Sequence, residues 1–468
     1  MNYYETQFKK LIEPFYGSKR SKMIDEELLK GNLLPHTYSV IERIDMTNYQ
    51  VYSIDPQGCE DADDAFSIYF ENQKLYLAIH IADPTEYINL DSELWKTIEV
   101  RVVTRYPSNR KPIHMIPEQI MSKSSLMVNE FGNTKNAITV LTEIDQVTHH
   151  PKGKIRLVFS RINVKMENAL SYTTAGEIYD TCSVLQKGIK ISNALLEARS
   201  YKTKGTILNE ICISYVKYEN ECELTLYRDT VIEKEMKTMI AEFAIFANTF
   251  VGEYLKINFQ GRGLFRTCNA NEWLQTVYNI SGQELLNEII VNGIRADYMS
   301  NVSSHDLVGS PEYCHFTSPI RRLSDCVCHY LLKYIHLKQS NTTISVPFTN
   351  EQLEKYSSSC VSLTKSMKNI QYRDNKFRLI QVMGYLLMCG EPVKIGYYVS
   401  SYTGLFLNII ISSINEHTIY ISYTLRINNL ESNKYQIKKQ NFLDITTINC
   451  LDKFDQGSIP ELDACFVN

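Results

Sequence analysis

The chain has 468 residues, of which 44% are apolar, and its formal net charge at pH 7 is −4. This length has room for about two or three domains, and the apolar fraction excludes an intrinsically disordered protein. The slightly acidic balance argues against binding nucleic acid over the whole surface, although it is compatible with a local basic groove.

The cysteines and the N-terminus indicate the compartment. Twelve cysteines are scattered without a CxxC pair, and the first residues, Met1 to Glu5, include no apolar signal region. These features predict free thiols in a reducing, cytoplasmic compartment. No uninterrupted apolar run is long enough to span a bilayer, so we expect a soluble, monomeric protein without membrane contact.

Residues 1–50 are mixed and charged, and Gly17 to Arg20 interrupt a short helical stretch. We expect this segment to form an N-terminal extension that carries no chemistry.

From Val51 the pattern becomes that of strands. Residues 51–54 alternate in polarity, residues 66–70 place apolar side chains on one face, and residues 75–82 alternate again after a turn at Asn72-Gln73. These segments predict paired, half-buried strands on both sides of the loop that joins them.

That loop contains four aspartates within ten residues, namely Asp55, Asp61, Asp63 and Asp64. Carboxylates this close repel one another, and a hard divalent cation such as Mg²⁺ or Mn²⁺ relieves the repulsion. The calcium loop of an EF-hand would need acidic residues where Gln57 and Cys59 stand. A solvated acidic turn is the alternative, but flanking strands that pack in a core favour a bound cation.

A basic segment follows, in which Arg101, Arg105, Arg110 and Lys111 surround Tyr106. Cations interleaved with an aromatic ring suit a single strand of nucleic acid, whose phosphates need charge and whose bases need a stacking face. A solvated charged surface is the alternative. Prolines 107, 112 and 117 predict an extended loop here.

The remaining elements follow from periodicity. Residues 137–144 and 155–159 read as strands, whereas residues 182–196, 232–254 and 351–389 have helical spacing. The helix over 232–254 is expected to be long and buried, with Glu242 solvated beside the apolar stripe and Asn248 bonded to a backbone group. From Pro392 the chain is β-rich again, which fits a small barrel.

A second chemical segment runs from Tyr313 to His329. Ser318 suits an N-cap and Pro319 the first helical position, so a helix is expected to begin there. Arg321 would stand in the first turn, where the helix dipole disfavours a cation unless an anion binds. The alternatives are an ion pair of Arg321 with Asp325, one turn on, and a merely structural role for Arg322.

An acidic metal loop and an anion-binding helix start together describe a site for phosphate chemistry. Carboxylate-bound metals activate water, and arginine neutralises the oxygens of a scissile phosphate. Phosphodiester hydrolysis is the simplest interpretation.

At this point the chain resembles a known family. The pattern IDP-x4-D-x-DDA from Ile54 to Ala65, and HFTSPIRR from His315 to Arg322, are similar to the catalytic domain of the ribonuclease II family, which includes ribonuclease R and the exosome nuclease. Landmarks between the motifs agree in order and spacing: residues 78–85, 105–107, 115–117, 170–172 and the helix from Met239 to Asn248, which resembles LIEEFMLLAN. Two separated motifs with concordant landmarks are far more specific than one.

The resemblance implies an α+β fold. Residues 51–390 would form the RNB-type catalytic domain, a mixed β-sheet surrounded by helices, and residues 391–468 a small S1-like or OB-like β-barrel. It also implies processive, 3′-to-5′ hydrolysis of single-stranded RNA to nucleoside 5′-monophosphates, with two Mg²⁺ ions or Mn²⁺ in their place.

The resemblance also assigns residues. The four aspartates, Asp55, Asp61, Asp63 and Asp64, would hold the metals, with Asp63 the most critical for catalysis, and Arg321 would neutralise the scissile phosphate. The other RNA-binding positions would be Tyr106, Tyr172, Glu242, Thr317, Ser318 and Arg322. Of these, Tyr106 and Tyr172 would stack on bases, Tyr172 near the 3′ end, and Glu242 would lie near the terminal nucleotide. Ordinary core roles remain the alternative for the two tyrosines and Glu242.

Several departures from the family pattern affect RNA binding. The metal loop begins at residue 55, which leaves too little chain before it for the two cold-shock barrels that usually help to channel RNA. Residues 304–309 keep His305 but lose the family's phenylalanine, and the segment after Gly205 has no obvious aromatic partner for the terminal base. Gly404-Leu405-Phe406 fits a mark of the S1 barrel in an otherwise divergent tail.

Three functions therefore compete. The leading hypothesis is an active exoribonuclease, since all four aspartates and Arg321 are present. An RNA-binding regulator that keeps the fold without turnover is the second, and a DNA nuclease or general phosphodiesterase the third. An RNA-binding or helicase partner would compensate for the missing barrels.

Overall fold

The structure is a computed structural model. It describes residues 12–19, 22–30, 35–108, 110–200, 214–218, 224–277, 279–280, 285, 288–289, 294–340, 343–403, 406–426, 440–445, 447–449 and 465–467. The expectations for the segment after Gly205 and for Gly404-Leu405 fall outside these residues. Among the helices in the described ranges, none is both long enough and apolar enough to cross a bilayer.

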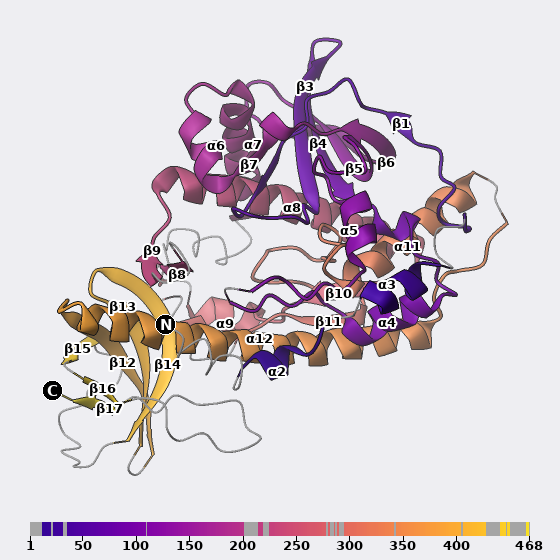
Figure 1. The fold of residues 1–468 in the computed structure, drawn as a ribbon. Coiled ribbons are helices and arrows are strands. Elements are labelled where there is room, and N and C mark those ends of the chain that lie inside the picture. The colour runs from indigo at the N-terminus through magenta and orange to yellow at the C-terminus, as the bar shows by residue number, and fades with distance from the viewer. Residues whose placement is uncertain are drawn as a thin grey trace.

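The central element is a five-stranded sheet in the order β1-β6-β5-β4-β3 (Figure 1). Its strands are β1 (Ile44–Asp45), β3 (Asp64–Glu71), β4 (Lys74–Ala82), β5 (Thr134–Ile144) and β6 (Pro151–Asn163). Strands β3 to β6 pair antiparallel, and short β1 pairs parallel to β6. The predicted turn between β3 and β4 is confirmed, because Asn72 and Gln73 both have positive φ, as a tight two-residue hairpin requires.

The sheet is buried more completely than its sequence predicts. In β4, Leu77, Ile79 and Ile81 are buried on one face, but Ala78, His80 and Ala82 are fully buried on the other. The expectation of a half-buried strand is therefore wrong for β4, which has neighbours on both sides and cover on both faces. The side chains on the second face are small or can be neutral, so the alternation of polarity in the sequence does not indicate that this face is buried. At the distal end of β3 the opposite holds, and Phe70 is 55% exposed.

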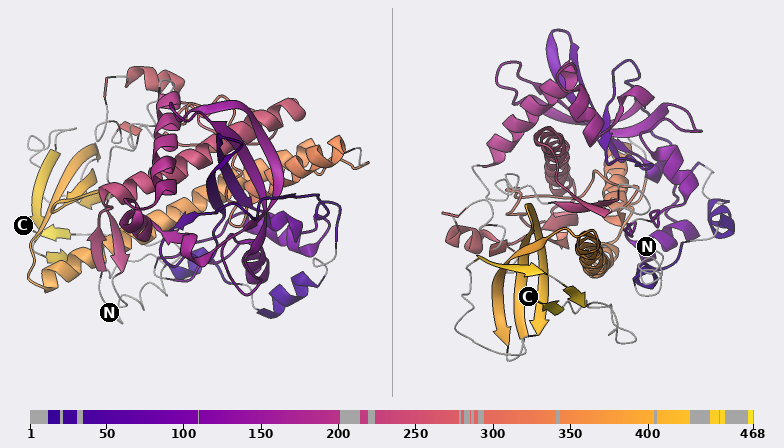
Figure 2. Two further views of the ribbon diagram at one scale, coloured as in Figure 1. Left: turned by 90° about the horizontal axis from the view of Figure 1, so that it is seen from above. Right: turned by 60° about the vertical axis from the view of Figure 1, so that its left-hand side comes forward.

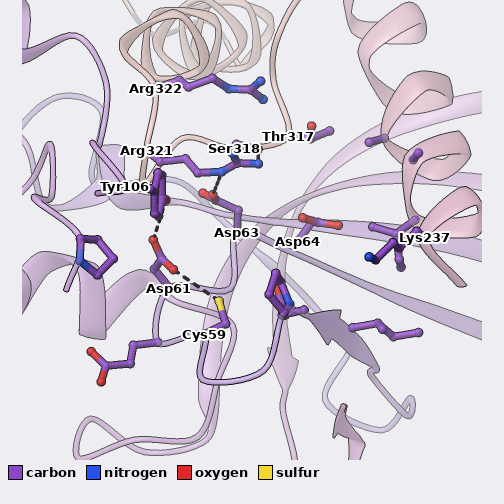
Figure 3. A pocket seen from close by; sticks show the side chains of 18 of the residues that line it. Cys59, Asp61, Asp63, Asp64, Tyr106, Lys237, Thr317, Ser318, Arg321 and Arg322 are labelled. Carbon is purple, nitrogen blue, oxygen red and sulfur yellow. Dashed lines mark hydrogen bonds and ion pairs between the residues drawn. The ribbon is translucent and has the colours of Figure 1, made fainter. Parts of the chain in front are cut away.

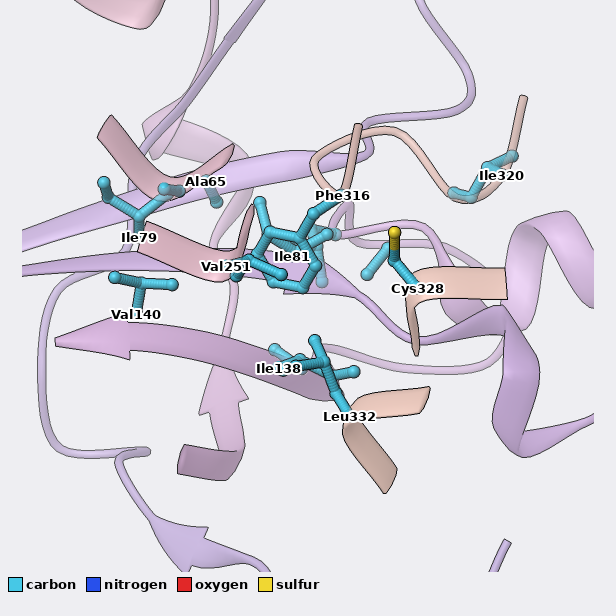
Figure 4. Packing of buried hydrophobic residues seen from close by; sticks show 14 of the residues in the cluster. Ala65, Ile79, Ile81, Ile138, Val140, Val251, Phe316, Ile320, Cys328 and Leu332 are labelled. Atoms are coloured by element: carbon cyan, nitrogen blue, oxygen red, sulfur yellow. The ribbon is translucent and has the colours of Figure 1, made fainter. Parts of the chain in front are cut away.

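Helices cover the apolar face of the sheet. These are α7 (Ser183–Ser200), α8 (Val231–Asn258) and α11 (Leu323–Gln339). The predicted long helix is confirmed as α8, whose buried Met236, Met239 and Phe243 continue at helical spacing to Leu255. Figure 4 shows Val251 of α8 and Leu332 of α11 among the isoleucines of the sheet. Thr230 begins α8 with a capping box, in which Glu233 bonds back to the Thr230 N–H.

A second layer lies below α8 (Figures 1 and 2). It contains α12 (Asn350–Met388), the predicted C-terminal helix, and the antiparallel pair of β10 (Arg262–Thr267) and β11 (Asp297–Asn301). The other α-helices of the described ranges are α2 (Glu13–Tyr16), α3 (Lys22–Leu29), α4 (Glu93–Arg101), α5 (Glu118–Ser124), α6 (Tyr172–Ile178) and α9 (Asn271–Thr276). Two short pairs complete this part of the chain: β2 (Ser53–Asp55) with β7 (Ala169–Ser171), and β8 (Tyr215–Tyr218) with β9 (Leu224–Tyr227).

The C-terminal region forms an antiparallel sheet in the order β14-β13-β12-β15. Its strands are β12 (Val393–Thr403), β13 (Phe406–Ile414), β14 (His417–Arg426) and β15 (Gln440–Ile445), and β16 (Thr447–Asn449) pairs separately with β17 (Cys465–Val467). The β-rich prediction is confirmed, but a closed barrel is not: across the described strands, β14 and β15 remain the two edges. One face packs on Phe377 and Met383 of α12 and on Tyr16 of α2, so the helix and the N-terminal segment complete the core that barrel closure would otherwise supply.

Candidate active site

The aspartate loop is held by two strands of different sheets. Asp55 ends β2, where it pairs with Ser171 of β7, and Asp64 begins β3, where it pairs with Ile81 of β4. Between them the chain turns at Gly58, whose φ of 80° favours glycine. The sequence thus places an acidic loop at the end of a rigid sheet, which fixes its backbone from both sides.

The loop lines a cavity of about 1060 Å³. Opposite it lie the segment from Thr317 to Arg322, the loop that carries Tyr106, and one face of α8 (Figure 3). The structure therefore brings together the two sequence motifs, although more than 250 residues separate them. All four predicted aspartates line this cavity.

Asp63 is the aspartate most tightly held. It is 4% exposed, and its Oδ1 accepts from the Ile320 N–H at 2.8 Å while its Oδ2 accepts from Arg321 Nε at 3.0 Å. Arg321 also donates to Ser318 Oγ at 2.9 Å, and 44% of its side chain is exposed. The anion that the sequence predicted for Arg321 is thus, in this structure, the carboxylate of Asp63.

Asp61 belongs to the opposite wall. Its Oδ2 accepts from the Tyr106 hydroxyl at 3.2 Å, and its Oδ1 accepts from Cys59 Sγ at 3.3 Å (Figure 3). Tyr106 is half-buried and lines the cavity. Its hydroxyl therefore fixes the ring beside the acidic loop.

Negative charge is concentrated on the aspartate-loop side of the cavity. Burial, followed by the neighbouring Asp64 and Asp61 carboxylates, raises the pKa of Asp55 to about 7. Burial also raises the pKa of Asp64 to about 6 and that of Asp63 well above its usual range, although Arg321 opposes both shifts. One arginine does not neutralise this group of carboxylates, so the site favours a proton or a cation.

The donor set fits a hard divalent cation by its chemistry. Asp55, Asp61 and Asp64 supply carboxylate oxygens, and their mutual repulsion is what such an ion relieves. Within the described part of the chain, however, no three acidic, His or Cys side chains already converge as a metal-binding group. The carboxylate oxygens line the cavity, and they would move together around a cation when it binds.

The helix start is not where the sequence predicts it. α11 begins at Leu323 with Arg322 as its N-cap, and residues 319–321 form a turn. Asp325 explains the shift: its Oδ1 accepts from the Ser318 N–H at 2.7 Å and from Arg322 Nη2 at 2.9 Å. The expectations that Ser318 is the N-cap and that Arg321 stands in the first turn are therefore wrong. The alternative pairing of Arg321 with Asp325 is also wrong, since Arg321 pairs with Asp63.

The predicted basic cluster divides in two. Arg110 and Lys111 line the cavity, but Arg101 and Arg105 do not. Arg101 donates to the His114 carbonyl at 3.1 Å, and Arg105 donates to the Tyr16 carbonyl at 2.5 Å. Arg101 and Arg105 therefore hold backbone segments together, and Arg105 fixes the N-terminal segment at Tyr16.

The remaining predicted RNA-binding residues also divide. Tyr172 begins α6 and lines the cavity, as do Thr317, Ser318 and Arg322. Glu242 does not, because it points to the other side of α8, where it is 1% exposed and forms an ion pair with Arg199. The expectation of a solvated Glu242 is wrong, and its proposed place near the terminal nucleotide has no geometric support.

Sequence reasoning did not assign several residues that line this site, among them Lys237, Ala241 and His315. Lys237 and Ala241 face the cavity from α8, and His315 lines it from the loop before α11. The helical period of α8 could have revealed the first two, because they lie eleven and seven positions before Asn248, which shares the face. Asn248 Oδ1 accepts from the Phe316 N–H at 2.8 Å, which confirms the predicted backbone partner and fixes the second motif against α8.

The comparison with protein families decides which group the chain belongs to. The RNB domain matches residues 43–338, well over half of the chain. This chain belongs to the RNB family. The match contains both motifs that line the cavity of this RNB domain.

Curated relatives are longer than this RNB protein. It is 24% identical to ribonuclease R of Thermotoga maritima over 481 aligned residues, which cover 90% of this chain but 63% of the relative. The chain thus spans less than two thirds of that protein's length.

Solved structures show the same fold. Mycoplasma genitalium RNase R in complex with ribose-methylated single-stranded RNA superposes with a TM-score of 0.77 at 18% identity, covering 99% of this chain and 78% of that one. Yeast Ssd1, a pseudonuclease, superposes with a TM-score of 0.63, also at 18% identity, covering 84% of this chain and 51% of that one. At such identities the likeness establishes the fold, and the side chains must argue for the activity.

Proposed function

We propose that this RNB protein is a divalent-metal-dependent 3′-to-5′ exoribonuclease that degrades single-stranded RNA processively to nucleoside 5′-monophosphates. The observation that carries the proposal is the cavity in which Asp55, Asp61, Asp63 and Asp64 face Arg321. The relatives named ribonuclease R support it. The free thiols of the described cysteines agree with a reducing compartment, and we propose the cytoplasm.

The chain's own groups have distinct tasks in this reaction. Asp55, Asp61 and Asp64 would hold Mg²⁺ or Mn²⁺, which when bound supplies an activated water and stabilises the leaving oxygen. Arg321 would turn its exposed guanidinium from Asp63 to the scissile phosphate, and this exchange frees Asp63 for the metal side of the site. Tyr106 offers a ring for base stacking on the wall beside Asp61.

Hydrolysis of end-labelled RNA tests the proposal. A 5′-labelled single strand incubated with the protein and Mg²⁺ should shorten from its 3′ end, and chelation with EDTA should stop the reaction. Asp63→Asn should lower the rate by about a hundredfold to a thousandfold, because a positioned group that acts in the transition state is removed.

Asp45→Asn is the matched control, since Asp45 lies on edge strand β1 and bonds to Thr47, outside the cavity. It should leave the rate unchanged. An intact 3′ end in Mg²⁺ and Mn²⁺, or equal rates for Asp63→Asn and the parent protein, would contradict an exonuclease.

An RNA-binding protein without turnover is the second candidate. It is favoured by the engagement of Asp63 with Arg321 and Ile320, which leaves the carboxylates unconverged, and by the fold likeness to a pseudonuclease. Binding of RNA without cleavage under either ion would establish it. A matched DNA strand separates the remaining candidate, a general phosphodiesterase, because a site that reads the 2′-hydroxyl favours RNA.

A further inference from the structure

Lys237 is a cation on the cavity wall that the proposed mechanism does not use. It projects from α8, and 36% of its side chain is exposed. In Figure 3 it lies beyond Asp64, whereas Tyr106 lies on the other side of the aspartates. Arg110, Lys111 and Arg322 also line the cavity, but Lys237 is the cation that α8 contributes to it.

The surroundings of Lys237 hold its ammonium group in place. Its Nζ lies 2.7 Å from both carboxylate oxygens of Asp229. The same Nζ is 5.4 Å from the ring centroid of Tyr172 and 5.2 Å from that of Tyr215, so it sits against two aromatic faces. Tyr215 donates to Asp229 Oδ1 at 3.3 Å, which ties the pair to β8. The position of the Lys237 ammonium group is therefore fixed by Asp229 and the two tyrosine rings.

The Lys237 ammonium group can still donate a hydrogen bond to an anion. An ammonium group has three protons, and the two contacts to Asp229 account for two of them. One turn further along α8, the residue that faces the cavity is Ala241, which carries no charge that would compete for the ammonium. Lys237 thus presents a positioned donor beside Tyr172, the ring proposed to stack on a base.

We propose that Lys237 binds a phosphate group of the RNA, on the side of the cavity opposite the Arg321 site. The inference rests on the proposed function, in which RNA enters this cavity. It adds a second anchoring point, so that one strand is held by Arg321 at the scissile phosphate and by Lys237 next to Tyr172. Either a backbone phosphodiester or a 3′-terminal phosphate supplies the required chemistry.

The salt dependence of RNA binding tests this assignment. The affinity of a fluorescent single-stranded oligonucleotide is measured in EDTA at several salt concentrations, for the parent protein, Lys237→Met and Lys237→Arg. Loss of one phosphate contact to a single strand should reduce the magnitude of the slope of log K against log salt by about 0.7 in Lys237→Met. Lys237→Arg keeps the charge and should retain the slope.

Lys355→Met is the matched control. Lys355 also pairs with a carboxylate, that of Glu99 at 2.9 Å, but it lies outside the cavity. It should leave the slope unchanged. If Lys237→Met keeps the parent slope, or shifts it no more than Lys355→Met, the assignment is wrong and Lys237 is a structural residue.

Two substrates distinguish the sources of the phosphate. If the slope changes for oligonucleotides with a 3′-hydroxyl as well as a 3′-phosphate, Lys237 binds the backbone; if it changes only for the 3′-phosphate form, Lys237 binds the terminal group. Binding is measured without a divalent ion and therefore does not depend on hydrolysis. A failure of hydrolysis would contradict the proposed function, but the effect of Lys237 on RNA binding could still be determined.

Discussion

The protein contains two clusters of charged side chains, and the two differ in how their buried carboxylates are neutralised. In the Asp83 network, Asp83 lies 2.8 Å from Lys333 Nζ and 2.6 Å from Arg43 Nη2, and all three side chains are almost fully buried. In the aspartate cluster, Asp55, Asp61, Asp63 and Asp64 share the nearby Arg321. Because Glu86 also pairs with Arg43, the Asp83 network has as many cations as carboxylates, whereas the four aspartates of the other cluster share one paired arginine.

The pKa values follow this balance. Burial by itself would raise the pKa of Asp83, but Lys333 and Arg43 hold it well below its usual range. In the cavity, burial and neighbouring carboxylates raise the pKa of Asp55 to about 7. In a balanced and closed network the loss of one partner is costly, whereas an unbalanced cluster that faces a cavity is a candidate for binding a ligand. The comparison therefore separates structural from functional carboxylates without reference to sequence motifs.

The largest expected effect tests this separation directly. Asp83→Asn leaves buried Lys333 without its carboxylate partner and leaves Arg43 with Glu86 alone, so the free energy of unfolding should fall by about 3–5 kcal/mol. Urea denaturation at pH 7 measures the change. Asp55→Asn, made in the aspartate cluster, should change the same quantity by less than about 1 kcal/mol, because it removes a carboxylate that the neighbouring Asp64 and Asp61 repel. Equal losses in both variants would contradict the comparison.

His80 represents a third solution, in which a buried group stays neutral. Its ring nitrogens lie 3.0 Å from Ser67 Oγ and 2.8 Å from Thr139 Oγ1, and burial lowers its pKa to about 3. Because the unfolded chain binds this proton below about pH 6.5 and the native protein does not, His80 contributes stability above that pH.

This contribution should be lost on acidification. We expect the free energy of unfolding to fall by about 1.4 kcal/mol for each pH unit between pH 6 and pH 4 through His80. His80→Gln does not titrate, so its unfolding free energy should depend less steeply on pH over this window. Identical slopes for the variant and the parent protein would assign the acid sensitivity to other groups.

Tyr106 tests how the aspartate cluster contacts substrate. Its ring is expected to stack on a base, so Tyr106→Ala should weaken binding of single-stranded RNA by about 1–3 kcal/mol. Tyr106→Phe keeps the ring and removes the bond to Asp61, so it should cost clearly less. Fluorescence anisotropy with a labelled oligonucleotide gives both values. If Tyr106→Phe weakens binding as much as Tyr106→Ala, the hydroxyl rather than the ring is what matters.

The smallest effect concerns the ion itself. At Mg²⁺ or Mn²⁺ concentrations about ten times the dissociation constant, binding to the native cluster should stabilise the protein by about 1.4 kcal/mol, and EDTA should reverse the shift. Thermal unfolding with and without the ion measures it. Asp55→Asn should reduce the gain, whereas Asp83→Asn should retain it; a gain that survives in Asp55→Asn would place the ion elsewhere.

The sequence by itself determined the local part of this protein. Hydrophobic period gave the long helix α8 and the strands β3 to β6, because those patterns depend on residues only a few positions apart. The crowding of aspartates from Asp55 to Asp64 also indicated a charged site before any fold was known. The pairing of this loop with Arg321 was predicted from two motifs and is confirmed by the ion pair with Asp63.

The tertiary structure alone decided which partner each charge received. Asp325 bonds to the Ser318 N–H and moves the start of α11 to Leu323, and Arg199 draws Glu242 away from the cavity. The C-terminal strands complete their core against α12 without closing into a barrel across the described residues. The physical reason is common to all three: the direction of a side chain, or the closing of a sheet, depends on packing between segments far apart in the chain, which no local pattern records.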